Sequence, residues 1–325
     1  MPEPGLVIVD KPAGMTSHDV VARVRRLAGT RRVGHAGTLD PMATGVLVIG
    51  VEQATRLLGH LMLTAKEYRA TIRLGQSTTT DDAEGEPIGG APATAVTQEE
   101  LEAGIKHLTG AIMQVPPGVS AIKVNGERAY KLTRAGAAPE LKPRQVTVYD
   151  FAVTRVQADG DYLDVDAVIG CSSGTYIRAL ARDLGAALGT GGHLTALRRT
   201  RVGSYDIAQA QTLDQLSMRF LPISLPSAAA AAFEVVGLTW QQARRLAHGA
   251  QIPLRELRQA GEPSPGAEPG QGLTAAALAS MPPSEALAAF APGGTLVALV
   301  TVESDRLRSL AVFTTPDELS GDLGE

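Results

Sequence analysis

The sequence predicts a mixed α/β fold in two parts, and three observations support this prediction. The chain has 325 residues, which exceeds the usual size of a single domain. Strand-like and helix-like patterns alternate through residues 1–224, whereas later patterns are mostly strand-like. Between these parts, residues 225–232 have the small-residue composition of a linker. We therefore expect a larger unit at 1–224 and a smaller β-rich unit at 233–315.

The N-terminal elements are a strand, a helix and a second, buried strand. Gly5 to Asp10 is apolar, and a turn follows at residues 11–14. Ser17 is a suitable N-cap for a helix that ends at Gly29 and whose valines form one apolar face. Residues 46–50 are apolar without alternation, which is typical of a strand buried on both faces.

Further elements complete the larger unit. Glu52 to Leu63 has a helical pattern, and Glu67 to Leu74 alternates like a half-buried strand. A capping signal at residues 97–100 opens a helix that reaches residue 108. Three more strands and a helix are expected near residues 119–124, 144–156, 162–170 and 175–188.

The smaller unit combines a short helix with a pair of strands. The helix is expected at Leu238 to Ala247, and the strands at Gly294 to Val302 and Leu310 to Phe313. Residues 259–272 are rich in proline, glycine and glutamate, so we expect a flexible insertion between helix and strands.

Composition bears on the compartment and the partners. One cysteine, Cys171, excludes an intramolecular disulfide framework and agrees with a reducing cytosol. No signal peptide or membrane-spanning segment is recognisable, so we expect a cytoplasmic protein without membrane contact. The net charge of -4 argues weakly against a nucleic-acid partner, because proteins that bind nucleic acid normally have a basic surface. However, residues 1–210 hold 23 Lys plus Arg against 22 Asp plus Glu, and residues 211–325 hold 7 against 12, so the acidity is C-terminal.

Arginines gather in two places that flank the strongest motif. One group covers residues 23–32 and the other covers residues 198–201. Such runs are either solvated faces or phosphate contacts. The candidates for phosphate contacts are Arg31, Arg32, Arg198 and Arg199.

The segment Gly34 to Gly45 carries the strongest functional signal. Its glycines permit positive φ or the close approach of a ligand, and Pro41 disfavours helix at Asp40. We therefore expect an irregular, rigid loop that presents the Asp40 carboxylate, anchored by the apolar strand behind it. An ordinary Asp-Pro turn is the alternative, and the additional glycines and His35 favour a site.

Several common chemistries lack their residue sets. The chain has no P-loop, no Gly-x-Ser-x-Gly elbow, no His-Glu-x-x-His and no dinucleotide fingerprint. The histidines are scattered singly, and the carboxylates of residues 81–86 have no suitably spaced partner. We therefore predict no metal site and expect that acidic turn to face solvent. Metal-free chemistry on Asp40 remains, because an aspartate is ionised at neutral pH and is a ready nucleophile.

The segment Cys171 to Arg178 supplies partners for this carboxylate. It joins the end of an expected strand to the start of an expected helix. The planar fork of Arg178 suits a carboxylate, so this residue is a candidate ion-pair partner of Asp40. Tyr176 and Tyr68 are candidates for contact with a flat substrate, and core packing is the alternative for each of them.

Together these segments resemble the tRNA pseudouridine synthase B family over roughly residues 5–215. The loop at 34–45 is similar to the catalytic-aspartate motif of the family, and Asp10-Lys11-Pro12 with Gly14, Thr16 and Ser17 is similar to its N-terminal motif. Similar motifs follow in order at Ser120-Ala121-Ile122-Lys123 with Gly126 and Tyr130, at Gly174 to Arg178 and at Leu197-Arg198-Arg199. Val119 stands where many members have Tyr, which affects a wall contact and not the chemistry. The C-terminal unit resembles a PUA-like RNA-binding domain at residues 238–249 and 311–313.

The resemblance implies a catalytic domain with a largely antiparallel central sheet. It implies isomerisation of uridine 55 in the T-loop of tRNA to pseudouridine, with the T-arm stem-loop as partner and without cofactor, metal or guide RNA. Asp40 would be the nucleophile, attacking either the base or the ribose anomeric carbon, with Arg178 paired to it. We expect the protein to act as a monomer.

The resemblance also implies roles for the remaining residues of the site. Tyr68 would stack on the base and help to remove its C5 proton, Tyr176 and Leu197 would line the pocket, and Lys11 would support the loop. Gly37 would let the RNA come close. His35 would fill the stack that the flipped base leaves, and a capping or core histidine is the alternative for it.

Three other functions are weighed against this one. A guide-RNA-dependent relative would carry long lysine-rich extensions, which this sequence does not show. A non-catalytic tRNA-binding or tRNA-folding protein would not need Asp40, Tyr68 and Arg178 together. A hydrolase of small nucleosides would need a second acid and would leave the arginine groups unexplained.

Overall fold

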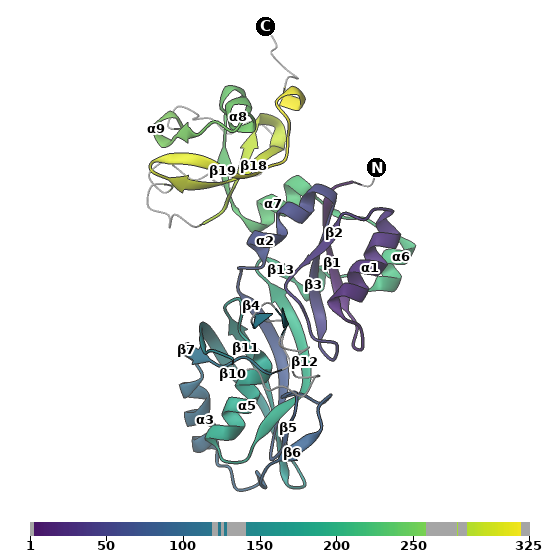
Figure 1. Ribbon diagram of the computed structural model, residues 1–325, viewed down its shortest axis with the longest axis vertical. Coiled ribbons are helices and arrows are strands. Elements are labelled where there is room, and N and C mark those ends of the chain that lie inside the picture. Colours follow the sequence, from purple (N-terminus) through teal and green to yellow (C-terminus); the bar gives the residue numbers. More distant parts are fainter. Residues whose placement is uncertain are drawn as a thin grey trace.

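The computed structural model describes residues 3–118, 123–124, 127–128, 141–257, 278 and 285–319. The molecule contains two separate sheets along its long axis (Figure 1). The N-terminal part forms the larger sheet and the C-terminal part forms the smaller one. The expected insertion at 259–272 lies outside the described residues, as do Val119 and most of the central motif: Ser120, Ala121, Ile122, Gly126 and Tyr130.

The larger sheet is almost entirely antiparallel, which confirms the expected fold class. Within the described residues it has ten strands, in the order β14-β1-β3-β12-β4-β11-β10-β7, with β2 paired to β3 and β13 paired to β12. A short parallel pairing joins β3 and β12. The strands are β1 Gly5–Lys11, β2 Val33–Ala36, β3 Thr44–Val51, β4 Lys66–Leu74, β7 Gly110–Gln114, β10 Arg144–Asp159, β11 Tyr162–Cys171, β12 Gly192–Val202, β13 Tyr205–Asp206 and β14 Ile223–Ser224. Two small hairpins accompany it, β5 Ser77–Thr78 with β6 Pro87–Gly89 and β8 Lys123–Val124 with β9 Glu127–Arg128.

Helices cover both halves of this sheet (Figure 1). Helices α1 (Ser17–Ala28) and α6 (Leu213–Met218) lie beside β1 and β3, and helices α3 (Gln98–His107) and α5 (Ile177–Ala187) lie beside the other half. The N-cap of α1 is Thr16 and not Ser17, because Thr16 and Asp19 form a capping box and Ser17 bonds elsewhere. The expected helix at residues 52–63 is only a 3-10 turn, Glu52–Arg56, followed by the short helix α2, Leu58–Leu61.

The start of the glycine-rich segment is regular, contrary to expectation. Gly34, His35 and Ala36 belong to β2 and pair with β3 through Gly50, Ile49 and Val48. Only Gly37 to Ala43 forms a loop, because Gly37 has a φ of 86° and Pro41 lies in its middle. The loop thus joins two paired strands, β2 and β3.

The smaller sheet has the β-rich form of the PUA-like domain that the sequence predicts. Its strand order is β15-β17-β18-β19-β16, with bounds Glu234–Gly237, Leu287–Ala291, Thr295–Glu303, Arg306–Val312 and Ile252–Pro253. Helices α8 (Trp240–Ala247) and α9 (Leu254–Leu257) lie beside it. The helix α8 starts at a Thr239–Gln242 capping box.

The stretch that was expected as a linker is a helix, α7 (Leu225–Ala232). Ala228 and Ala229 are fully buried, in a cluster that contains Leu6 of β1, Leu299 of β18 and Phe313. Alanines let the helix backbone approach both sheets closely, so the small residues that suggested a linker form a junction core instead. The two sheets therefore share one apolar cluster.

Candidate active site

Side chains from three elements hold the Asp40 loop in place. The Ser17 hydroxyl of α1 accepts from the Leu39 amide (2.9 Å) and donates to the Leu39 carbonyl (3.2 Å). The buried Lys11 ammonium, at the end of β1, donates to the carbonyls of Pro12, Met15 and Pro41 at 2.9, 2.7 and 3.2 Å. The loop is thus rigid around Asp40, as the sequence predicts.

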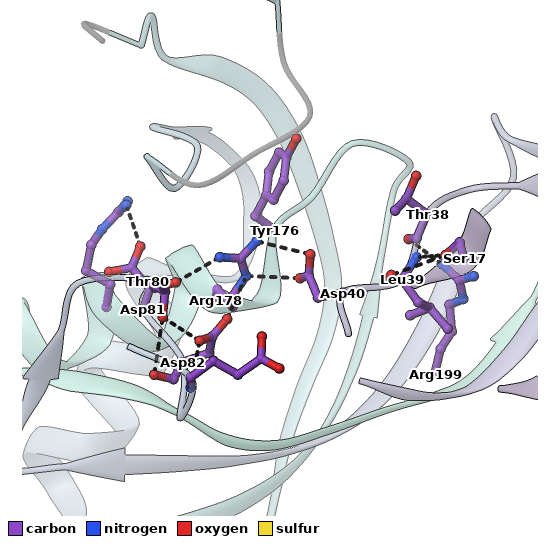
Figure 2. A network of polar contacts seen from close by, with 12 residues as sticks. Ser17, Thr38, Leu39, Asp40, Thr80, Asp81, Asp82, Tyr176, Arg178 and Arg199 are labelled. Atoms are coloured by element: carbon purple, nitrogen blue, oxygen red, sulfur yellow. Dashed lines mark hydrogen bonds and ion pairs between the residues drawn. The ribbon is translucent and has the colours of Figure 1, made fainter. Parts of the chain in front are cut away.

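The third anchor is Arg199 of β12, which corrects its expected role at an RNA phosphate. Its side chain is 1% exposed, and its guanidinium donates to the carbonyls of Val46 (2.8 Å), Gly37 (3.0 Å) and Thr38 (3.3 Å). Carbonyls of the loop and of β3 therefore occupy the donors that a phosphate would need. Figure 2 shows Arg199 below Thr38 and Leu39 of the loop.

Arg178 binds the Asp40 carboxylate with two parallel hydrogen bonds. Its Nε lies 3.0 Å from Oδ2 and its Nη2 lies 3.2 Å from Oδ1, the fork geometry expected from the residue types (Figure 2). The Arg178 side chain is 4% exposed, whereas that of Asp40 is 35% exposed. The arginine is thus a buried support, and the carboxylate faces open space.

Asp82 is a second, buried carboxylate on the same arginine. It lies 3.5 Å from Arg178 Nε, its side chain is 4% exposed, and the remaining Arg178 Nη1 donates to the Thr80 carbonyl at 2.8 Å. The prediction of a solvent-facing acidic turn is therefore wrong for Asp82. The arginine supplies the positive charge that makes its burial possible.

Asp81, the first carboxylate of this turn, also contacts α5. Asp81 forms an ion pair with Arg182, 3.3 Å away, and burial raises the pKa of Asp81. The pKa of Glu84 is raised as well, by burial and by the negative charges of Asp82 and Asp40. Asp81 and Asp82 therefore belong to the site, whereas Glu84 and Glu86 are exposed, as the sequence predicts.

Tyr68 and Leu197 lie on one face of the sheet. In the antiparallel register of β4 and β12, Tyr68 is opposite Arg199 and Ala70 is opposite Leu197, and directly opposed residues share a face. Tyr68 is 7% exposed, and burial raises the pKa of its phenol, an effect that the positive charge of Arg199 partly offsets. The phenol therefore keeps its proton at neutral pH.

The backbone of Tyr176 is fixed by a glutamine from the neighbouring strand. Gln114, at the end of β7 and 2% exposed, accepts from the Tyr176 amide (2.8 Å) and donates to its carbonyl (3.1 Å). Tyr176 stands at the start of α5, two residues before Arg178, and Figure 2 shows its side chain close to the Arg178–Asp40 pair. The sequence thus locates Tyr176 correctly at the strand-to-helix joint.

A second buried lysine lies behind the loop. Lys66 donates to the carbonyls of Met62 (2.9 Å) and Thr64 (2.6 Å), and a Cβ added to Gly37 would lie 3.6 Å from its Cε. Burial, together with the positive charge of Arg199, lowers the pKa of Lys66 to about 8. Burial also lowers the pKa of Lys11 to about 8, although the negative charges of Asp40 and Glu84 oppose this change.

His35 lies on β2, apart from these contacts. Its ring packs edge-on against His18 of α1, with 5.6 Å between the ring centroids, and its buried Nδ1 has no hydrogen-bond partner. Burial and the nearby charges of His18 and Arg199 lower its pKa, so the imidazole is neutral at neutral pH.

The other candidate phosphate contacts have different environments. Arg31 and Arg32 are exposed just before β2, and Arg32 lies 3.5 Å from Glu52. Arg198 is 39% exposed and binds Asp10 with two hydrogen bonds of 3.0 and 2.8 Å. These three remain predictions as RNA contacts.

Gly45 is a position where a side chain has no room. A Cβ there would lie 2.2 Å from the Arg199 carbonyl, at a φ of 100°. We expect Gly45→Ala to lower the free energy of unfolding by about 2–3 kcal/mol, measured by urea titration. Gly59→Ala is the control, because its Cβ would have no neighbour within 4 Å. An equal effect of the two substitutions would contradict the close approach of β3 and β12.

Sequence reasoning missed several residues of the site, chiefly Asp82, Gln114 and Lys66. Each is a buried polar side chain, and the partners of Asp82 and Gln114 are far away in the sequence, whereas those of Lys66 are the nearby carbonyls of Met62 and Thr64. Arg178 could have indicated Asp82 from the sequence. A buried guanidinium that binds one carboxylate still has unused N–H donors, which need a second acceptor. Within the described ranges, no group of three or more His, Cys, Asp or Glu side chains is arranged to hold a metal ion. In the same residues, no helix is long and apolar enough to cross a bilayer.

Two family models match the larger unit. Residues 25–177 match the N-terminal domain of the TruB family of pseudouridylate synthases, and residues 178–223 match the C-terminal domain of tRNA pseudouridylate synthase B. The tRNA pseudouridine synthase B of Thermobifida fusca is 66% identical over 252 residues, which cover 76% of this chain and 86% of the relative. That of Streptomyces coelicolor is 54% identical over 314 residues, which cover 95% and 97% of the two chains.

A solved structure has the same fold at low identity. A chain from the crystal structure of a Cbf5-Nop10-Gar1 complex superposes with a TM-score of 0.70 at 24% identity, covering 97% of this chain and 86% of that one. This likeness extends through both sheets. From the two family models and from relatives matched over nearly their whole length, the chain belongs to the TruB family of pseudouridylate synthases.

Proposed function

We propose that the protein isomerises uridine 55 in the T-loop of tRNA to pseudouridine, with Asp40 as the nucleophile. The observation that carries this proposal is the Asp40 carboxylate, held by the buried fork of Arg178 on a loop with three further anchors. A fixed, half-open carboxylate suits covalent attack, because little reorganisation is needed to reach the reacting atom. The relatives named tRNA pseudouridine synthase B support tRNA as the substrate.

The reaction breaks one bond and forms another at the same ribose carbon. Asp40 adds either to the base or to the anomeric carbon, the C1′–N1 bond breaks, and the uracil turns so that C5 bonds to C1′. Loss of the C5 proton, uptake of one proton by N1 and release of Asp40 then give pseudouridine. The atoms balance without an external reactant, so the site has to hold the detached base and exclude water.

Tyr68 and Leu197 would form the wall for the base. They share a face of the sheet with the Arg199 anchor, and Tyr68 is held among buried side chains. Burial raises the pKa of the phenol, so the ring meets the base as a neutral group, and we propose stacking as its main role. Its oxygen is a weak base, which is enough for a C5 proton whose loss restores the conjugated uracil ring.

The base must leave its stack to reach Asp40, and we propose that His35 fills the gap. A neutral imidazole whose buried Nδ1 is unpartnered suits contact with bases. We expect His35→Ala to weaken binding of a T-arm stem-loop or slow flipping by about 10-fold, given that stacking contributes about 1–3 kcal/mol per base. Fluorescence of a 2-aminopurine beside the target would follow flipping, with His107→Ala as control. Unchanged binding and flipping would remove this assignment.

We further propose residues 1–224 as the catalytic domain and residues 233–315 as an RNA-binding domain, with Arg31, Arg32 and Arg198 near RNA phosphates. The exposed arginines next to β2 support contact with the backbone of the T-arm. The larger unit holds all the residues of the proposed site, so it would act on tRNA without a guide RNA.

A transcript assay tests the function directly. The purified protein is incubated with unmodified tRNA transcript, without added metal or guide RNA, and pseudouridine is mapped along the product. We expect conversion at position 55 alone. Binding of the transcript without conversion would instead favour a tRNA-folding protein that keeps the cleft.

The lowered pKa of Lys11 predicts how the rate changes with pH. Below about pH 8 its ammonium has three donors for three carbonyls, and above it the neutral amine has only two. We expect the single-turnover rate to fall as the pH rises from 8 to 9.5, because the Pro41 anchor weakens. The pKa of Lys66 is lowered to a similar value, so its titration could cause the same fall in rate. If the rate of Lys66→Met still falls over this pH range, the effect is due to Lys11. A flat profile across this range would contradict the role of Lys11.

A further inference from the structure

An open cavity of about 550 Å³ lies between helices α1 and α6, where β1 ends. Its lining includes three arginines, Arg23 and Arg26 of α1 and Arg198 of β12. None of the three takes part in holding Asp40. A cavity of this size is in the range of small-ligand sites, about 300–1,000 Å³.

Arg198 is the residue of β12 that lines the cavity, and its neighbours in the strand, Leu197 and Arg199, belong to the candidate active site. Successive side chains of a strand point to opposite faces, so Arg198 points away from Leu197 and Arg199. Arg199 is opposite Tyr68 in the strand register, on the face of the proposed uracil site. Arg198 lines the cavity. Lys11 belongs to both places, because it lines the cavity and bonds the Pro41 carbonyl of the catalytic loop.

The charges of the cavity favour an anion. Arg198 is neutralised by Asp10 in a two-bond pair, and its Nη1 also lies 3.2 Å from the Thr44 hydroxyl. Arg23 and Arg26, one helical turn apart, are exposed, and among the described residues neither forms an ion pair. Against these two charges the lining offers one further carboxylate, Asp214. Two guanidinium groups one helical turn apart, with one carboxylate in the same lining, leave a positive excess that suits a phosphate.

The remaining surface is suited to a ring. Pro12, Met15 and Leu213 contribute apolar area to the lining, next to the Thr212 hydroxyl. Met15 and Leu213 pack against the main core, which fixes their positions. An apolar floor beside paired guanidinium groups matches a nucleotide better than it matches an inorganic ion.

We propose that this cavity binds a phosphate-bearing nucleotide, with its phosphate at Arg23 and Arg26 and its base against Pro12, Met15 and Leu213. The nucleotide is either part of the bound RNA, in which case the inference rests on the proposed function, or a free mononucleotide. Lys11 lines the cavity and also bonds the Pro41 carbonyl of the catalytic loop. Lys11 therefore connects the lining of the cavity to the loop that carries Asp40.

Binding assays on the full chain test this site and separate its two ligand sources. Filter binding measures the Kd of a T-arm stem-loop RNA at several salt concentrations, and equilibrium dialysis measures the Kd of adenosine 5′-monophosphate. The variants are Arg23→Gln with Arg26→Gln, Asp214→Asn, and a control that removes two exposed charges elsewhere, Lys106→Gln with Arg155→Gln. Circular dichroism confirms folding of each variant.

For RNA as the source, the double arginine variant raises the RNA Kd about 10-fold and lowers the slope of log Kd against log salt by about two. Asp214→Asn tightens RNA binding, and the control pair changes nothing. For a free nucleotide, the wild type binds adenosine 5′-monophosphate with a millimolar or lower Kd that the double arginine variant loses, with RNA binding unchanged.

The proposal is overturned if the double arginine variant matches the wild type for both ligands, or if the wild type binds neither. Because binding is measured without turnover, an RNA that binds but is not modified would count against the proposed function alone.

Discussion

Replacing Asp40 by asparagine is expected to abolish pseudouridine formation and leave RNA binding unchanged within about twofold. The amide has the same shape and still offers one oxygen to the Arg178 fork, but it is not a nucleophile. We expect the single-turnover rate on tRNA transcript to fall at least about 10⁴-fold, as for the loss of other covalent nucleophiles. Mass spectrometry of the digested product measures this loss.

Asp150→Asn is the matched control for this experiment. Asp150 is an exposed residue of β10, so its substitution makes the same chemical change at a distance from the loop. Its rate should equal that of the wild type. Turnover by Asp40→Asn within tenfold of the control would rule out covalent attack by Asp40.

The second large effect is expected at Arg178. A lysine keeps the charge but has one nitrogen in place of the planar fork, so it cannot reproduce the two parallel bonds to Asp40. We expect Arg178→Lys to lower the chemical rate by about 10²–10³-fold. Arg178→Met removes the charge and leaves Asp82 buried without its partner. We expect this variant to lose about 3–5 kcal/mol of unfolding free energy, measured by urea titration.

Two further variants separate charge from structure. Asp82→Asn in the Arg178→Met background removes the unpaired buried charge and should restore part of the lost stability. Arg182→Lys, one turn further along α5, alters an ion pair whose arginine is 27% exposed and should have little effect on either measurement. Full activity of Arg178→Lys would show that the fork is not needed to hold Asp40.

The sequence predicts the elements of this protein better than their contacts. Local patterns locate β1, β3, β4, β11 and α5 to within a few residues, because each depends on neighbouring residues alone. The same reasoning locates Asp40 and its partner Arg178 and identifies the family. It gives the wrong environment for Asp82, since an acidic turn far from Arg178 in sequence has no local sign of burial.

The environments of Arg199 and α7 could also not be predicted from the sequence. Arg199 looks like an exposed cation in sequence, but the neighbouring strand and loop present three carbonyls to it. The alanines of α7 have no amphipathic pattern strong enough to indicate a helix, and their burial depends on a second sheet. Such positions are decided by tertiary contacts, which a single sequence does not display.

Three consecutive residues of β12 make this strand sensitive to the insertion or deletion of a residue. Leu197 belongs to the proposed wall for the uracil, Arg198 lines the arginine-lined cavity, and Arg199 holds the catalytic loop. The insertion or deletion of one residue upstream of them would exchange the two faces at once and place a charge where the base must lie. Over evolution, this strand can therefore accept substitutions far more readily than changes in length.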